Sequence, residues 1–264
     1  MSENDAILKV NGLKTYFYQA SGVSKAVDGV SFDIPAGKTL GVVGESGCGK
    51  STMLKAVIGL LPVRQGDIRI ENESIVKAVG ERKRAIMRRF GVAFQGGALF
   101  RSYTIRENIA LPLEEYTDYP RDTITRLVSE KLEMVGMKGT EDMMPGDLSG
   151  GMIKRAAVAR ALALDPKIIF FDEPSAGLDP LNSANLDELI LDIRDRCNAA
   201  IGIVTHELDS IFTIADRAVF LDRDAKTVIA DGPPAELRDH CPVEKVRVFL
   251  NRGRLKEGER NHGH

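Results

Sequence analysis

Two glycine-rich turns, far apart in the chain, contain the residues best suited to chemistry. The first, Gly44-Glu45-Ser46-Gly47-Cys48-Gly49-Lys50-Ser51, has the pattern of a phosphate-binding P-loop. Its backbone N–H groups can converge on phosphate oxygens, Lys50 can bridge the β- and γ-phosphates, Ser51 can bind Mg²⁺, and Thr52 can contact the α-phosphate. The second turn, Leu148-Ser149-Gly150-Gly151, also precedes a predicted helix. Since one nucleotide does not need both turns from a single copy, we predict half-sites that are completed when two copies meet.

Polar side chains at the ends of predicted strands supply the other candidate groups. Asp172 and Glu173 follow an apolar run, at the strand end where parallel sheets bind ligands. Asp172 suits Mg²⁺ coordination, and Glu173 suits polarising the water that attacks a γ-phosphate. Gln95 and His206 each follow a strand as well, and Gln95 could reach Mg²⁺ and the attacking water. Alone, each of these residues is more often structural, so their catalytic interpretation depends on the P-loop.

The elements that must position these groups alternate between strand-like and helix-like patterns, which is typical of an α/β domain with a largely parallel sheet. We predict buried strands at residues 39–43, 90–94, 167–171 and 200–204, and helices at 50–60, 152–164 and 181–196. Residues 7–34 look rich in strand. From about 102 to 144 apolar residues recur at helical spacing, which indicates a smaller helical subdomain.

Length, charge and composition narrow the class of protein. The 264 residues fit one large α/β domain, or one domain with a helical insertion. A formal net charge of −2 gives no general attraction to nucleic acid. Three cysteines and four histidines lack zinc-ligand spacing and suit a reducing cytosol. Met1–Asp5 lacks the features of a signal peptide, and no apolar run approaches the ~20 residues that span a bilayer, so any membrane role would come through a partner.

Taken together, these motifs resemble those of the nucleotide-binding subunit of ABC transporters, over about residues 7–235. Gly44–Thr52 is similar to the Walker A motif, Gln95 to the Q-loop, Leu148–Gly151 to the ABC signature, residues 168–173 to Walker B, Ser175–Asp179 to the D-loop, and His206 to the switch histidine. The resemblance implies a P-loop NTPase fold of the ABC-ATPase type. Such a fold has a RecA-like core, an N-terminal antiparallel β-subdomain and a helical signature subdomain, here at about 102–160. The ATP-binding domain would cover 1–250, followed by a charged tail at 251–264.

The resemblance also implies a mechanism, in which two copies form a head-to-tail dimer that closes on two ATP molecules. Leu148, Ser149, Gly150, Gly151 and Asp179 of one copy would contact the ATP held by the P-loop of the other. Catalysis would involve Glu173, His206 and Gln95, and Mg²⁺ would be held by Ser51, Gln95 and Asp172. Gln95, His206 and Asp172 would also lie among the ATP-binding residues. The aromatic residue that stacks on adenine lies within Tyr16-Phe17-Tyr18, and we favour Phe17.

A narrower resemblance concerns the transported substrate. Met152 follows the signature where the family usually has glutamine, and with residues 94–100 it resembles the ATPases of Mla/Mce-type lipid transport systems. This implies a peripheral protein on the cytoplasmic face of the inner membrane. Its partners would be a permease, a periplasmic Mce-type lipid-binding subunit and a STAS-type subunit. Residues 13–17 and 25–30 look more like oligopeptide-transporter ATPases. The size of the chain also leaves an iron–sulphur assembly ATPase as an alternative. Glu173 and His206 argue against a non-hydrolysing regulator.

Overall fold

The computed structural model describes residues 6–19 and 22–252. Its central sheet has the strand order β10-β9-β3-β8-β7-β6. These strands are β3 (Thr39–Val43), β6 (Phe90–Ala93), β7 (Ile168–Asp172), β8 (Ala200–Val204), β9 (Arg217–Leu221) and β10 (Val228–Gly232). All run parallel except β10, which pairs antiparallel with β9 at the edge. The predicted α/β class with a largely parallel sheet is therefore confirmed.

The middle of this sheet consists of the strands that carry the candidate site. β3, β8 and β7 are neighbours, and every residue in them is buried. Continuous burial explains why their sequences are unbroken apolar runs rather than alternating ones. Because the three strands are parallel, the loops after Val43, Asp172 and Val204 emerge at one edge of the sheet.

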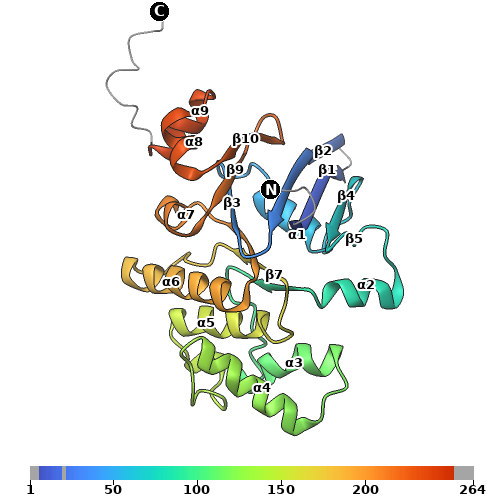
Figure 1. Cartoon of the computed structure of the whole chain (residues 1–264), viewed down its shortest axis with the longest axis vertical. Helices are drawn as coiled ribbons and strands as arrows, with labels where there is room; N and C mark the ends of the chain where they lie inside the picture. Colours follow the sequence, from blue (N-terminus) through green and yellow to red (C-terminus); the bar gives the residue numbers. More distant parts are fainter. Residues whose placement is uncertain (1–5, 20–21, 253–264) are drawn as a thin grey trace, which may run out of the picture.

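A second, antiparallel sheet has the order β2-β1-β4-β5 and lies at the upper right of the molecule (Figure 1). Its strands are β1 (Ala6–Gln19), β2 (Gly22–Pro35), β4 (Gln65–Ile70) and β5 (Glu73–Ser74). Leu8 and Val10 of β1 are buried, and a register shift before Leu13 keeps that residue and Thr15 buried as well. The strand-rich N-terminal part is thus two long paired strands, and β4 and β5 were not predicted.

The helices are α1 (Lys50–Val57), α2 (Gly80–Met87), α3 (Ile105–Tyr116), α4 (Arg121–Met134), α5 (Gly150–Ala161), α6 (Pro180–Cys197), α7 (Leu208–Ile214), α8 (Pro234–His240) and α9 (Glu244–Leu250). α3, α4 and α5 form a helical layer at the bottom of Figure 1. α5 lies directly on β6, since a Cβ at Gly91 would stand 2.1 Å from the carbonyl oxygen of Ala161. This close approach fixes the helix that follows the second glycine-rich turn.

The element boundaries differ in detail from the predictions. Strands 39–43 and 200–204 are confirmed, while the helix that begins at Lys50 ends at Val57 instead of near Leu60. It ends early because Gly59 adopts a positive φ of 77°, and its N–H bonds to the carbonyl of Ala56 at 3.1 Å. Within the described residues, no helix combines the length and the apolar composition needed to cross a bilayer. Met1–Asp5 and the charged tail from residue 253 onward lie outside the described residues.

Candidate functional site

The first glycine-rich turn runs from β3 into α1, and its glycines are required by space. Gly44 has φ 150°, and a Cβ there would lie 2.3 Å from the carbonyl oxygen of Leu221. Gly49 has φ 110°, and a Cβ there would lie 2.5 Å from the carbonyl oxygen of Ala26. Side chains at these positions would force the loop open. The tight loop ends at the N-terminus of α1, where backbone N–H groups and the helix dipole favour an anion.

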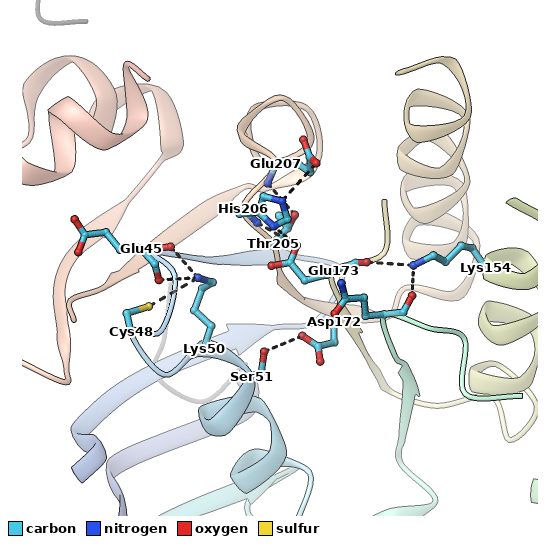
Figure 2. Close-up of polar contacts among 12 residues, drawn as sticks. Glu45, Cys48, Lys50, Ser51, Lys154, Asp172, Glu173, Thr205, His206 and Glu207 are labelled. Carbon is cyan, nitrogen blue, oxygen red and sulfur yellow. Dashed lines mark hydrogen bonds and ion pairs between the residues drawn. The ribbon is translucent and has the colours of Figure 1, made fainter. Parts of the chain in front are cut away.

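The side chains of Lys50 and Cys48 stabilise the conformation of this loop. Lys50 is buried, and its Nζ donates to the carbonyl oxygens of Gly44 at 2.8 Å and Glu45 at 3.1 Å (Figure 2). The Cys48 thiol is fully buried in the core, 3.9 Å from Lys50 Nζ, and burial raises its pKa. A phosphate contact of Cys48 would therefore come from its backbone. The carboxylate of Glu45 turns away to pair with Lys245 of α9 at 3.3 Å.

A pocket of about 390 Å³ opens beside this loop. It is lined by Phe17, Ser24, Lys25, Ala26, Ser46, Gly47, Gly49, Lys50, Ser51, Thr52, Glu173 and Lys226. Among the three adjacent aromatic residues, Phe17 is the one in this lining, while the Tyr16 hydroxyl donates to Asp28 at 2.7 Å. Sequence reasoning missed Lys25 and Lys226 as pocket residues, because only the fold brings them into the lining.

The acidic end of β7 faces the P-loop. Asp172 is only 8% exposed, and its Oδ1 accepts a hydrogen bond from Ser51 Oγ at 3.4 Å. Burial raises the pKa of Asp172, and the nearby charge of Glu173 raises it further. Among the described residues no cluster of three or more His, Cys, Asp or Glu side chains could hold a metal ion. A hydroxyl and one carboxylate nevertheless fit Mg²⁺, which takes few protein ligands and completes its shell with phosphate oxygens and water.

Glu173 and His206 meet across the ends of β7 and β8. Glu173 has a φ of 49°, and its N–H bonds to the carbonyl of Val204 at 2.8 Å. One carboxylate oxygen, Oε2, lies 2.8 Å from His206 Nδ1 and accepts the His206 backbone N–H at 3.2 Å. A left-handed conformation at a non-glycine residue is strained and is typical of functional sites. The turn places the carboxylate beside both the pocket and the histidine (Figure 2).

Gln95 occupies a different position from the other predicted catalytic residues. It follows β6, its side chain is exposed, and it is not part of the pocket lining. Its backbone carbonyl accepts a hydrogen bond from Lys154 of α5. Thus one chain brings Ser51 to Asp172 and Glu173 to His206, whereas Gln95 is tied to this group through its backbone carbonyl and Lys154.

The second glycine-rich turn lies outside this pocket. Leu148 is buried, while Ser149 and Gly150 are exposed at the start of α5, where the Ser149 side chain accepts the Met152 N–H at 3.3 Å. Asp179 similarly caps α6, accepting the N–H of Asn182 at 3.0 Å. The two helix starts are close together, since a Cβ on Gly151 would lie 3.8 Å from Asn182 Oδ1. The chain therefore presents an exposed helix N-terminus that its own pocket does not use.

Comparison with known proteins agrees with this arrangement. Residues 27–176 match the model of the ABC transporter family. The chain is 43% identical over 249 residues to the probable ribonucleotide transport ATP-binding protein mkl of Mycobacterium leprae, covering 94% of this chain and 70% of that protein. It is 37% identical over 224 residues to the intermembrane phospholipid transport system ATP-binding protein MlaF of Escherichia coli K12, covering 85% and 82%.

A solved structure extends the likeness to three dimensions. The dimeric structure of MJ0796, a bacterial ABC transporter cassette, superposes with a TM-score of 0.78 at 26% identity, covering 86% of this chain and 98% of that one. The same cassette as a dimer in a post-hydrolysis state, bound to ADP and Pi, gives the same TM-score. The chain therefore belongs to the ABC transporter family, and it is an ATP-binding and ATP-hydrolysing cassette of that family.

Proposed function

We propose that two copies of this chain pack head-to-tail around two ATP molecules and power a membrane permease that moves phospholipid or a related lipid. The proposal of a dimer rests on the separation of the two glycine-rich turns within one copy. The pocket of one copy contains the P-loop and Glu173, while Ser149, Gly150 and Gly151 stand outside it. The dimeric state of the similar cassette supports the same assembly.

In this assembly each group has a task set by its position. Ser51 and Asp172 would hold Mg²⁺, which neutralises phosphate charge when it is bound. Lys50 exchanges the carbonyls of Gly44 and Glu45 for the β- and γ-phosphates. Glu173 orients the attacking water and accepts its proton, and His206 fixes the Glu173 carboxylate through the contacts at its backbone N–H and Nδ1. The side-chain oxygen of Gln95 would be a further ligand to Mg²⁺.

We assign to Phe17 the role of stacking on the adenine ring, because Phe17 lines the pocket, whereas the Tyr16 hydroxyl is bound to Asp28. Replacing Phe17 by Ala should weaken ATP binding about tenfold, since stacking of a base on an aromatic ring is worth about 1–3 kcal/mol. Calorimetric titration with ATP measures this change. Tyr18→Ala is the matched control, because Tyr18 is mostly exposed and should leave affinity unchanged. Equal losses in both variants would contradict the assignment.

We assign the docking site of the permease to an apolar groove between β6 and the helical layer. This groove of about 300 Å³ is lined mainly by Met87, Phe90, Phe94, Phe100, Leu111, Pro112 and Tyr116. Phe100 is half exposed within it. A groove with this lining suits an apolar segment of a membrane partner, and it lies next to Gln95, so that docking can be sensed at the ATP site. The chain would then sit peripherally on the cytoplasmic face of the inner membrane.

Two observations support a lipid substrate: the MlaF relative is named for phospholipid transport, and Met152 follows the signature turn. The name of the mkl relative points instead to ribonucleotide transport. A tagged chain should co-purify from detergent-solubilised membranes with a permease, a Mce-type subunit and a STAS-type subunit, and mass spectrometry of the complex should find phospholipid. Phe100→Asp should release the permease, while Val79→Asp, at an exposed apolar residue elsewhere, should retain it. Enrichment of nucleotides or peptides in place of lipid would refute the lipid assignment.

A further inference from the structure

Lys154 is a buried cation next to the catalytic groups that no motif accounts for. It lies in the second turn of α5, and the residue is only 8% exposed. Its Nζ donates to the backbone carbonyl of Gln95 and, at 3.4 Å, to that of Glu173 (Figure 2). One side chain therefore joins the loop after β6 to the loop after β7.

The buried ammonium of Lys154 lies near two carboxylates, those of Glu173 and Asp172. Burial lowers its pKa, and the charges of Glu173 and Asp172 oppose that change. Other ionisable groups near the acidic pair include Lys50, Lys55, His206 and Glu207. The Lys154 ammonium counteracts the rise in the pKa of Asp172 that burial and the charge of Glu173 cause.

The contact with Glu173 also controls geometry. Glu173 is the residue with φ 49°, and its peptide N–H is already bound to the carbonyl of Val204. Lys154 fixes the carbonyl on the other side of the same residue. With both of its backbone groups held, Glu173 keeps the strained turn that directs its carboxylate to His206.

α5 holds the loop after β6 at a second point. Arg160 donates to the carbonyl oxygens of Gly97 at 2.8 Å and Ala98 at 2.7 Å. Contacts from α5 therefore hold the loop that contains Gln95 at two points. The first turn of α5 is the exposed turn that begins after Ser149. A movement of this first turn would be transmitted to both loops through Lys154.

We propose that Lys154 is a positioning residue that couples the signature helix α5, whose start serves the ATP of the partner copy, to the Glu173 carboxylate of its own site. The inference rests on the catalytic role proposed above for Glu173. In a dimer it gives a physical route from one ATP site to the other. Contact of Ser149 with one nucleotide fixes α5, and α5 fixes the carboxylate that acts on the second nucleotide.

The test uses the full chain with Lys154→Met, which keeps the apolar stem and removes the ammonium. The kcat for ATP hydrolysis should fall at least about tenfold, because small misplacements of catalytic groups are costly. The KM for ATP should change less than about threefold, because Lys154 is not part of the pocket lining. Lys154→Arg should restore most of kcat, and Lys138→Met, at an exposed lysine, should match the wild type.

Two further variants make the outcome decisive. Lys154→Gln retains a hydrogen-bond donor without the charge, so it should keep more kcat than Lys154→Met. An unchanged kcat in Lys154→Met, an effect on KM as large as that on kcat, or a loss of kcat that Lys154→Arg does not relieve would overturn the inference. Glu173→Gln is assayed in parallel. If that variant still hydrolyses ATP, the proposed function fails at its catalytic residue, a result distinct from failure of the Lys154 role.

Discussion

Replacement of Glu173 by Gln is expected to lower the rate of ATP hydrolysis by at least about a hundredfold, since a positioned general base contributes about 10²–10⁴. The amide has the size of the carboxylate and can still accept the His206 backbone N–H, so the turn at Glu173 should survive. It cannot accept a proton from water. Because Lys50, Ser51 and Phe17 are untouched, the variant should bind ATP and remain closed on it.

Two measurements check this expectation, namely steady-state release of phosphate and the size of the protein on gel filtration with and without ATP. The Glu173→Gln variant should elute as a stable dimer only with ATP. Glu207→Gln is the matched control, because Glu207 lies beside His206 but its carboxylate is 3.7 Å from Nε2 and partly exposed. Hydrolysis by Glu173→Gln at near the wild-type rate would show that another group activates the water.

The sequence predicts the strand ends of this site well and its supporting contacts poorly. β3 and β8 were predicted to the residue, because strands buried on both faces are continuous apolar runs bounded by polar residues. Since neighbouring parallel strands end at one edge, the meeting of Ser51 with Asp172 and of Glu173 with His206 follows from the order of the strands. That order itself, with β8 between β3 and β7, is a tertiary property.

The residues that were missed lack a local pattern. Lys154 has the appearance of a solvated helix residue, and its burial depends on how α5 packs beside β6 and β7. The short helix α7 was also missed, since its seven residues are too few for a helical period to emerge. The choice among Tyr16, Phe17 and Tyr18 depends on which face of β1 turns toward the P-loop, and the register shifts of β1 make that unpredictable from alternation.

If the dimer is head-to-tail, replacing Ser149 by Asp should have an effect on ATP hydrolysis as large as that of Glu173→Gln. Aspartate preserves the helix cap that Ser149 provides for the Met152 N–H, so the fold of α5 should be unaffected. Its negative charge, however, would face the γ-phosphate held by the partner copy, and close like charges repel strongly. The variant should bind ATP in its own pocket with nearly normal affinity, yet hydrolyse it at least about a hundredfold more slowly, because the closed dimer stabilises the transition-state charge.

Ser149→Asn is the matched control, since asparagine caps a helix as aspartate does but adds no charge, so it should keep more activity than Ser149→Asp. The decisive experiment mixes Ser149→Asp with Glu173→Gln before ATP is added. If each site is built from two copies, a mixed dimer has one site with both defects and one with neither. Random pairing should then restore up to about a quarter of the wild-type rate, because half of the dimers are mixed and each has one site of two without a substitution. The coupling through Lys154 proposed above would lower this fraction, because that site takes its Glu173 from the Ser149→Asp copy. If the signature turn served the ATP of its own copy, every site in the mixture would keep a defect and no activity would return.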